Sequence, residues 1–237
     1  EGNSGLAADD AVKSFNKAKE LLKEAEYDTI YVTGAVTVNS FDSEWTFGDL
    51  DGNEDNNKHY KLQRYLKYFG ALVKVPSGTE LTLKDIIIDG GGSELNTRDT
   101  SVTDPLIMND GKLTITSGSV LRNNHNVYQD VFHEGGAVRN AGTLIMNDGT
   151  IEANSAVSGG GVFNRGTFAF SGGKIINNAG KGMHKSSGTL DKNGNYKKEI
   201  FNAGGGVFIA NSGKMTMSGS AEISGNTAKI GGGISLG

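Results

Sequence analysis

Residues 136–154 read Gly136-Ala-Val-Arg-Asn-Ala-Gly-Thr-Leu-Ile-Met-Asn-Asp-Gly-Thr-Ile-Glu-Ala-Asn154, and residues 161–178 read Gly161-Val-Phe-Asn-Arg-Gly-Thr-Phe-Ala-Phe-Ser-Gly-Gly-Lys-Ile-Ile-Asn-Asn178. Both begin with glycine, pass through three short apolar runs separated by Gly, Asn or Ser, and end on asparagine. A third copy covers 206–226, and weaker copies cover 72–89 and 106–124. Such short apolar runs do not suit helices and are typical of strands.

The middle run of each copy alternates, as in Leu144/Met146 and Phe168/Phe170, so one face of each strand points inward. One coil cannot bury this face alone, but stacked coils form a continuous core. We therefore expect an all-β fold, a single-stranded parallel β-helix solenoid of about six coils. The body of each copy keeps nearly the same length while the linker varies, which predicts insertions along one edge of the stack, at 90–104, 125–134 and 179–203.

The start of the chain has a different pattern. Residues 7–26 place apolar side chains at helical spacing, with Asp9 and Asp10 early and lysines later, which predicts an amphipathic helix. Because an open β-helix end exposes strand edges and core, we expect residues 1–27 to form a helical cap.

The rest of the chain, 28–237, is expected to be the β-helix, with an irregular first coil at 28–69 and regular repeats at 70–237. The sequence stops at Gly231–Gly237, which resembles the first strand of another coil. We expect a fragment of a longer surface protein, truncated at its C-terminal end.

Composition excludes several classes of protein. Of the 36 glycines, 24 lie in residues 135–237 and follow no three-residue period, and there are two prolines, so the chain is not collagen. It contains no Cys and has a net charge of −4 without a basic block, which argues against a disulfide scaffold, a thiolate zinc site and a nucleic-acid partner. No apolar stretch is long enough for a transmembrane segment.

One polar residue recurs where the third strand of each copy ends. We expect these residues to form an internal ladder along the stack, because a stacked amide tolerates left-handed geometry and bonds its neighbours. The alternative is a set of turn-favouring residues without a ladder. The predicted ladder contains Asp89, Asn124, Asn154, Asn178 and Asn226.

The sequence offers no clear catalytic set. The neighbouring acids Asp9/Asp10, Asp49/Asp51, Glu54/Asp55 and Asp99/Asp104 do not recur on a strand face beside a basic residue, as carbohydrate cleavage requires. We therefore predict no catalytic residue, no metal site and no cofactor.

Two alternative sites involve residues outside the regular repeats. His125, His133 and His184 lie in or beside insertions, so a three-histidine site is the alternative to exposed loop histidines. Asn193-Gly194 predicts a hairpin turn rather than a calcium loop at 191–195.

The glycine motifs carry a resemblance. Gly135-Gly-Ala-Val138, Gly159-Gly-Gly-Val162 and Gly231-Gly-Gly-Ile234 resemble the Gly-Gly-Ala-Ile repeats of polymorphic outer-membrane proteins. Residues 28–38 and 81–90 are similar to bacterial cell-surface proteins of the pectin-lyase-like group. The resemblance implies a right-handed β-helix at the cell surface or outside the cell, in a group that contains adhesins, autotransporter passengers, polysaccharide lyases and glycoside hydrolases.

Aromatic and basic residues in the insertions suit recognition of a glycan or a protein above a rigid scaffold. We therefore expect a non-enzymatic, adhesin-like module that binds a host or cell-surface glycan or protein. The alternatives are a polysaccharide-degrading lyase or glycoside hydrolase, and a structural spacer. The candidate binding residues are Tyr128, Phe132, His133, His184, Tyr196, Lys197, Lys198 and Phe201.

Overall fold

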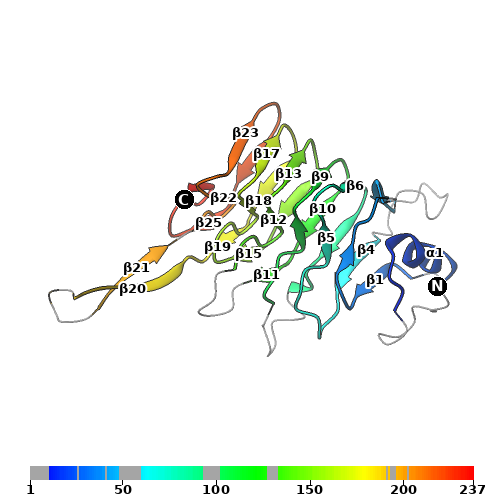
Figure 1. Cartoon of the computed structure of the whole chain (residues 1–237), viewed down its shortest axis with the longest axis horizontal. Coiled ribbons are helices and arrows are strands. Elements are labelled where there is room, and N and C mark those ends of the chain that lie inside the picture. Colours follow the sequence, from blue (N-terminus) through cyan, green and yellow to red (C-terminus); the bar gives the residue numbers. More distant parts are fainter. Residues whose placement is uncertain are drawn as a thin grey trace.

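A computed structural model describes residues 11–25, 27–40, 42–47, 60–92, 102–126, 133–190, 192, 196–201 and 203–237, with the side chains of 23–25, 183–190 and 196–201 left aside. The strands stack into four parallel sheets, and the chain passes through them in the same order in each regular coil (Figure 1). The protein is a parallel β-helix with one short N-terminal helix.

Sheet 1 opens each coil. It consists of β2 (Val36–Thr37), β5 (Val73–Val75), β8 (Ile107–Asn109), β12 (Val138–Asn140), β16 (Val162–Asn164), β22 (Val207–Ile209) and β26 (Ile234–Leu236). Sheet 2 follows, with β3 (Glu44–Thr46), β6 (Glu80–Lys84), β9 (Lys112–Ile115), β13 (Thr143–Met146), β17 (Thr167–Phe170) and β23 (Lys214–Met217). Six described coils start at β2, β5, β8, β12, β16 and β22, and β26 begins a seventh.

Sheet 3 closes the apolar core. It consists of β1 (Thr29–Val32), β4 (Lys61–Arg64), β7 (Ile87–Asp89), β10 (Val120–Arg122), β14 (Thr150–Glu152), β18 (Lys174–Ile176) and β24 (Glu222–Ser224). Sheet 4 is a fourth strand per coil that the three-strand prediction missed. It appears from the third coil on, as β11 (His125–Asn126), β15 (Ser155–Ala156), β19 (Ala179–Gly180) and β25 (Thr227–Ala228).

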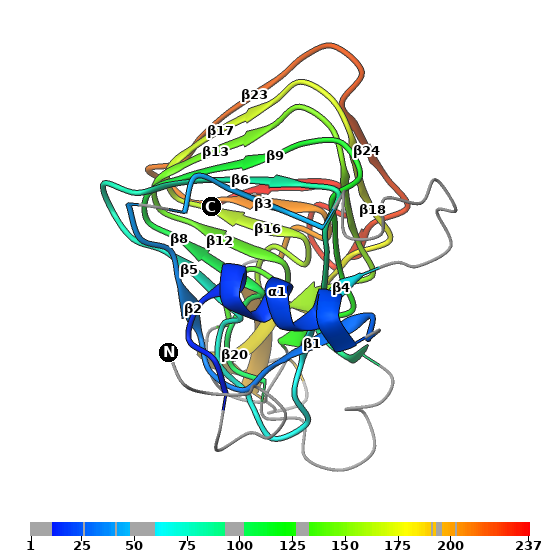
Figure 2. The same ribbon diagram turned by 90° about the vertical axis from the view of Figure 1, so that its right-hand side faces the viewer.

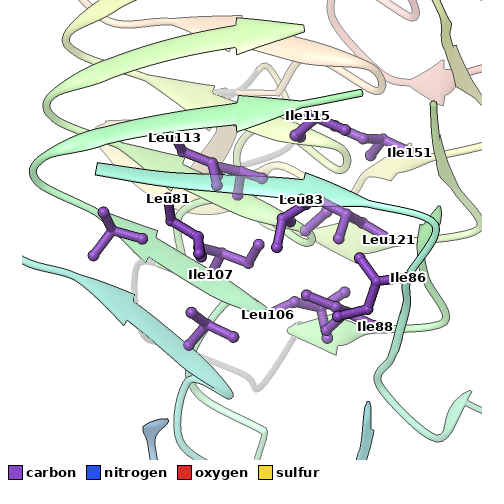
Figure 3. Close-up of a cluster of buried hydrophobic side chains, with 14 of the residues drawn as sticks. Leu81, Leu83, Ile86, Ile88, Leu106, Ile107, Leu113, Ile115, Leu121 and Ile151 are labelled. Carbon is purple, nitrogen blue, oxygen red and sulfur yellow. The ribbon is translucent and has the colours of Figure 1, made fainter. Parts of the chain in front are cut away.

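Strand register places like residues above one another. In sheet 2, Leu81, Leu113, Leu144 and Phe168 form one inward column, and each is at most 1% exposed. Figure 3 shows how aliphatic side chains from three sheets meet inside the coil. Burying each Leu or Ile side chain contributes about 1.5–3 kcal/mol, so the stack supplies the core that one coil lacks.

The helix α1 (Phe15–Ala25) lies across the N-terminal end of the stack (Figure 2). Phe15 stacks on Trp45 of the first coil, with ring centroids 4.7 Å apart, and Leu22 joins the same core. The predicted helix therefore exists, but its expected start at residue 7 is wrong, because residues 11–14 are not helical. Ser14 begins the helix instead: its Oγ accepts a hydrogen bond from the backbone N–H of Lys17 at 3.3 Å, as an N-cap does.

Candidate functional site

The three predicted insertions leave the stack at one corner. They follow β7, β11 and β19 and precede β8, β12 and β22, so each connects the end of one coil to sheet 1 of the next. We call this corner the insertion edge. Two of the predicted insertions start two residues later than expected, because residues 125–126 and 179–180 are strands of sheet 4. A further long connection, between β3 and β4, joins sheet 2 to sheet 3.

At the insertion edge a glycine pair precedes the sheet-1 strands β12, β16, β22 and β26, whether or not an insertion intervenes. Gly159 has φ of 67°, in the left-handed region, and a Cβ on this residue would overlap the carbonyl oxygen of Val162. The second glycine of the pair serves close stacking: a Cβ on Gly136 would overlap the carbonyl oxygen of Gly160 in the next coil. The Gly-Gly motif is thus one turn residue followed by one residue of close backbone approach.

The insertion after β19 contains the antiparallel hairpin of β20 (Met183–Leu190) and β21 (Tyr196–Phe201), as the sequence predicts. Register places His184 opposite Ile200, Lys198 opposite Ser186, Tyr196 opposite Leu190 and Phe201 opposite Met183, while Lys197 lies between Tyr196 and Lys198. Five candidate binding residues are therefore gathered on one projecting ribbon (Figure 1). Tyr128 and Phe132, like the turn at 193–195, lie outside the described residues.

His133 is not an exposed loop residue. It is 3% exposed, and its Nδ1 lies 2.9 Å from the carbonyl oxygen of Thr103, at the far end of the preceding insertion. Its backbone carbonyl accepts a hydrogen bond from the N–H of Ser158 at 3.1 Å. His133 therefore joins the base of one insertion to the next coil, and its assignment as a ligand contact is corrected.

His125 is a strand residue of sheet 4, and its Nδ1 lies 2.9 Å from Ser155 Oγ on the neighbouring strand. Burial, and secondarily the charge of Lys181, lower the pKa of the His125 imidazole. Ser155 is 4% exposed and His125 is half-buried, and their contact joins two neighbouring strands of sheet 4. Within the described part of the chain, no three His, Asp or Glu side chains form a group that could hold a metal ion.

Four of the five predicted ladder residues are joined by hydrogen bonds. The Oδ1 of Asn154 accepts the backbone N–H of Asn124 at 3.0 Å, that of Asn178 accepts the N–H of Asn154 at 3.0 Å, and that of Asn226 accepts the N–H of Asn178 at 2.9 Å. Each of the three amides also donates to a carbonyl oxygen of the preceding coil, at 2.8–3.0 Å. The sequence led us to expect the left-handed conformation at the asparagine itself. In the structure the residue before it adopts this conformation instead, and these residues are Asn123, Ala153, Asn177 and Gly225.

Asp89 is not a rung of this ladder. It is in register with Arg122, two residues before Asn124, so the ladder position of its coil is Gly91. Its carboxylate accepts hydrogen bonds from Arg122 Nε at 2.7 Å and from Asn123 Nδ2 at 3.2 Å. The sequence pattern misassigned Asp89 because this acid ends the third strand of its coil, whereas the ladder position lies two residues further along the chain.

Arg64 ends the ladder on the N-terminal side. Its side chain is 1% exposed and donates to Asn124 Oδ1 at 3.0 Å and to the carbonyl oxygen of Gly70. Burial lowers the pKa of the guanidinium to about 10. Gly91 has no side-chain amide, and its backbone N–H donates to Asp89 Oδ1 at 2.8 Å, so Arg64 supplies the donor that Asn124 Oδ1 would otherwise lack.

A second ladder was missed by the sequence analysis. Asn109 Nδ2 donates to Asn140 Oδ1 at 2.6 Å, and Asn140 Nδ2 donates to Asn164 Oδ1 at 2.7 Å, all three being fully buried. The recurring pattern of an aliphatic residue, any residue and Asn in the sheet-1 strands β8, β12 and β16 could have revealed it. Val75 is in register with Asn109, so the Asn109 Oδ1 has no recorded donor.

Aromatic residues on the outer face of sheet 1 do not form an open platform. Phe163 and Phe208 stack with centroids 5.4 Å apart, yet are only 5% and 3% exposed. Glu134 binds both Arg139 Nε at 2.9 Å and Arg165 Nη2 at 2.8 Å on this side of the coil. Glu134 and Asp89 are thus both held in ion pairs. Of the acid pairs that the sequence analysis considered for catalysis, only Asp104 lies among the described residues.

No described helix is long and apolar enough to span a membrane. Comparison of the chain with protein-family models, with curated proteins and with solved structures gives no match, so its assignment as a parallel β-helix rests on its own strand pairing and register.

Proposed function

We propose that the protein is a non-enzymatic display module of the adhesin type, which works at the cell surface or outside the cell and binds a host or cell-surface glycan or protein. The observation that supports this is the gathering of the insertions on one edge of a rigid stack, with the β20–β21 hairpin standing clear of it (Figure 1). Loops carried by a rigid scaffold are common sites of recognition. The similarity of the glycine motifs to outer-membrane repeats supports the same proposal.

The hairpin is the best candidate for the contact surface. His133 is buried at the base of an insertion and is removed from the proposed set. His184, Tyr196, Lys197, Lys198 and Phe201 remain together on the ribbon, where aromatic and basic residues suit sugar rings and acidic groups.

The test is a binding screen of the full chain against an array of glycans and surface proteins, repeated with residues 184–200 replaced by a short Gly-Ser turn. The matched control changes the exposed Asn211 and Ser212 at the turn between sheets 1 and 2. We expect the hairpin replacement to abolish a positive signal and the control to keep it. Equal binding by both variants would refute the hairpin as the contact surface, and no ligand in the whole array would favour the spacer alternative.

A further inference from the structure

The hairpin has less support than the other described strands. Strands in sheets 1 to 4 belong to stacks of four to seven, whereas β20 and β21 pair with each other alone. A single two-stranded ribbon is marginally stable in water, and segments with few packing contacts open locally at little free-energy cost. The backbone of this ribbon is therefore much easier to open than that of any coil.

The same segment is rich in lysine. Trypsin-like serine proteases accept a lysine side chain in their specificity pocket, and an extended peptide can pair with an exposed strand edge of a partner. The outer edges of β20 and β21 offer such a backbone, and Lys192, between the two strands, is exposed. The lysines of the hairpin are Lys185, Lys192, Lys197 and Lys198.

A cut in the hairpin would leave the coils on both sides joined. β16, β17, β18 and β19 before it pair with β22, β23, β24 and β25 after it, one pair in each sheet. The Asn178 N–H bonds Asn226 Oδ1 across the cut at 2.9 Å, and Phe163 stacks on Phe208. These contacts do not pass through residues 183–201.

We propose that the β20–β21 hairpin is a cleavage site for trypsin-like proteases, and that the cut protein remains a folded β-helix of two associated chains. In the reaction, water adds across the peptide bond after a hairpin lysine, giving a new carboxylate and a new amine; the protease is the other participant. The inference is independent of the proposed binding function, because it requires no ligand.

The test treats the full chain with a low concentration of trypsin, maps the cuts by mass spectrometry over time and follows the size of the native particle by gel filtration. We expect the first cut after Lys185, Lys192, Lys197 or Lys198, about a hundredfold faster than after a lysine of a coil strand such as Lys112. Both fragments should elute together, with an unchanged circular dichroism spectrum.

The matched variant replaces these four hairpin lysines with glutamine (K185Q, K192Q, K197Q and K198Q), which should slow the first cut about a hundredfold while leaving the spectrum of the intact protein unchanged. A first cut after Lys58 or Arg98 would overturn the proposal. So would separation of the two fragments under native conditions. Neither result depends on whether the glycan and protein array finds a ligand.

Discussion

Substituting Asn178 with alanine tests whether the ladder stabilises the stack through hydrogen bonds. Asn178 is fully buried; its Oδ1 accepts the Asn154 N–H at 3.0 Å, and its Nδ2 donates to the carbonyl oxygens of Ile151 and Ile176 at 2.9 Å each. The Oδ1 also accepts from Asn154 Nδ2 at 3.1 Å, and the Nδ2 also donates to Asn226 Oδ1 at 3.0 Å. Asn178→Ala removes all five contacts, in which the two Nδ2 hydrogens are shared among three acceptors, and leaves the Asn154 N–H without an acceptor. An orphaned buried donor costs about 1–3 kcal/mol and each of the three further bonds about 1 kcal/mol, so we expect a loss of about 4–6 kcal/mol in the free energy of unfolding.

Two further variants separate the causes of this loss. Asn226 makes the equivalent bonds but is only partly buried, so water can replace its amide and Asn226→Ala should cost about 1–2 kcal/mol. Asn178→Asp keeps the shape but places an oxygen where Nδ2 donated, so it should be at least as damaging as alanine at neutral pH. The exposed Asn211→Ala serves as the control and should change stability by less than about 0.5 kcal/mol.

The assay is denaturant unfolding followed by circular dichroism, combined with hydrogen exchange at the Asn154 amide. Exchange is needed because stacked coils can unfold in steps, and a single midpoint then hides a local effect. A loss below about 1 kcal/mol for Asn178→Ala, or one no larger than that for Asn226→Ala, would refute the ladder as a source of stability.

Three further changes test other features. Val75→Thr places a hydroxyl beside the Asn109 Oδ1, which has no hydrogen-bond donor, and should lower the free energy of unfolding in denaturant by less than about 0.5 kcal/mol. Val73→Thr, on the same strand, places its hydroxyl among apolar side chains and should lower it by about 1–3 kcal/mol. Equal losses for the two variants would contradict the register. Ala153 has φ of 52°, so Ala153→Gly should raise the unfolding free energy by up to about 1 kcal/mol, and a loss would speak against left-handed strain. The pKa of the His125 imidazole is lowered in the folded state, so the unfolded chain binds the proton more readily and the free energy of unfolding falls as the pH drops below about 6.5. His125→Gln should flatten this fall in thermal melts measured across about pH 5–8. An unchanged pH profile would exclude His125 as its source.

Several elements follow from the sequence because their causes are local and repeated. The alternation of Leu144 with Met146 and the recurrence of Asn154, Asn178 and Asn226 at the end of the third strand are patterns that return from coil to coil. The hairpin also follows from a local signal, since Asn193-Gly194 favours a tight turn between two strands.

Other features depend on contacts between coils. Asp89 satisfies the same residue pattern as the ladder asparagines, yet its register with Arg122 gives it an ion pair instead. Spacing along the chain could not reveal this, because the number of residues between two coils changes with each insertion. The helix start at Ser14 could have been found from the sequence, because serine is a favoured N-cap residue. The apolar spacing of residues 7–26 extends past Ser14 and pointed to an earlier start.

The sequence alone determined that this protein is a stack of short strands, which residues face its core and on which edge the insertions leave. This was possible because each sequence repeat shows both the two-residue alternation of a strand and the length of one coil. Only the tertiary structure decided that His133 is buried beneath an insertion, that Phe163 and Phe208 are covered, and that Arg64 completes the ladder. The physical reason is that exposure and hydrogen-bond partners are set by residues one or two coils away, and the sequence pattern of a single coil does not contain them.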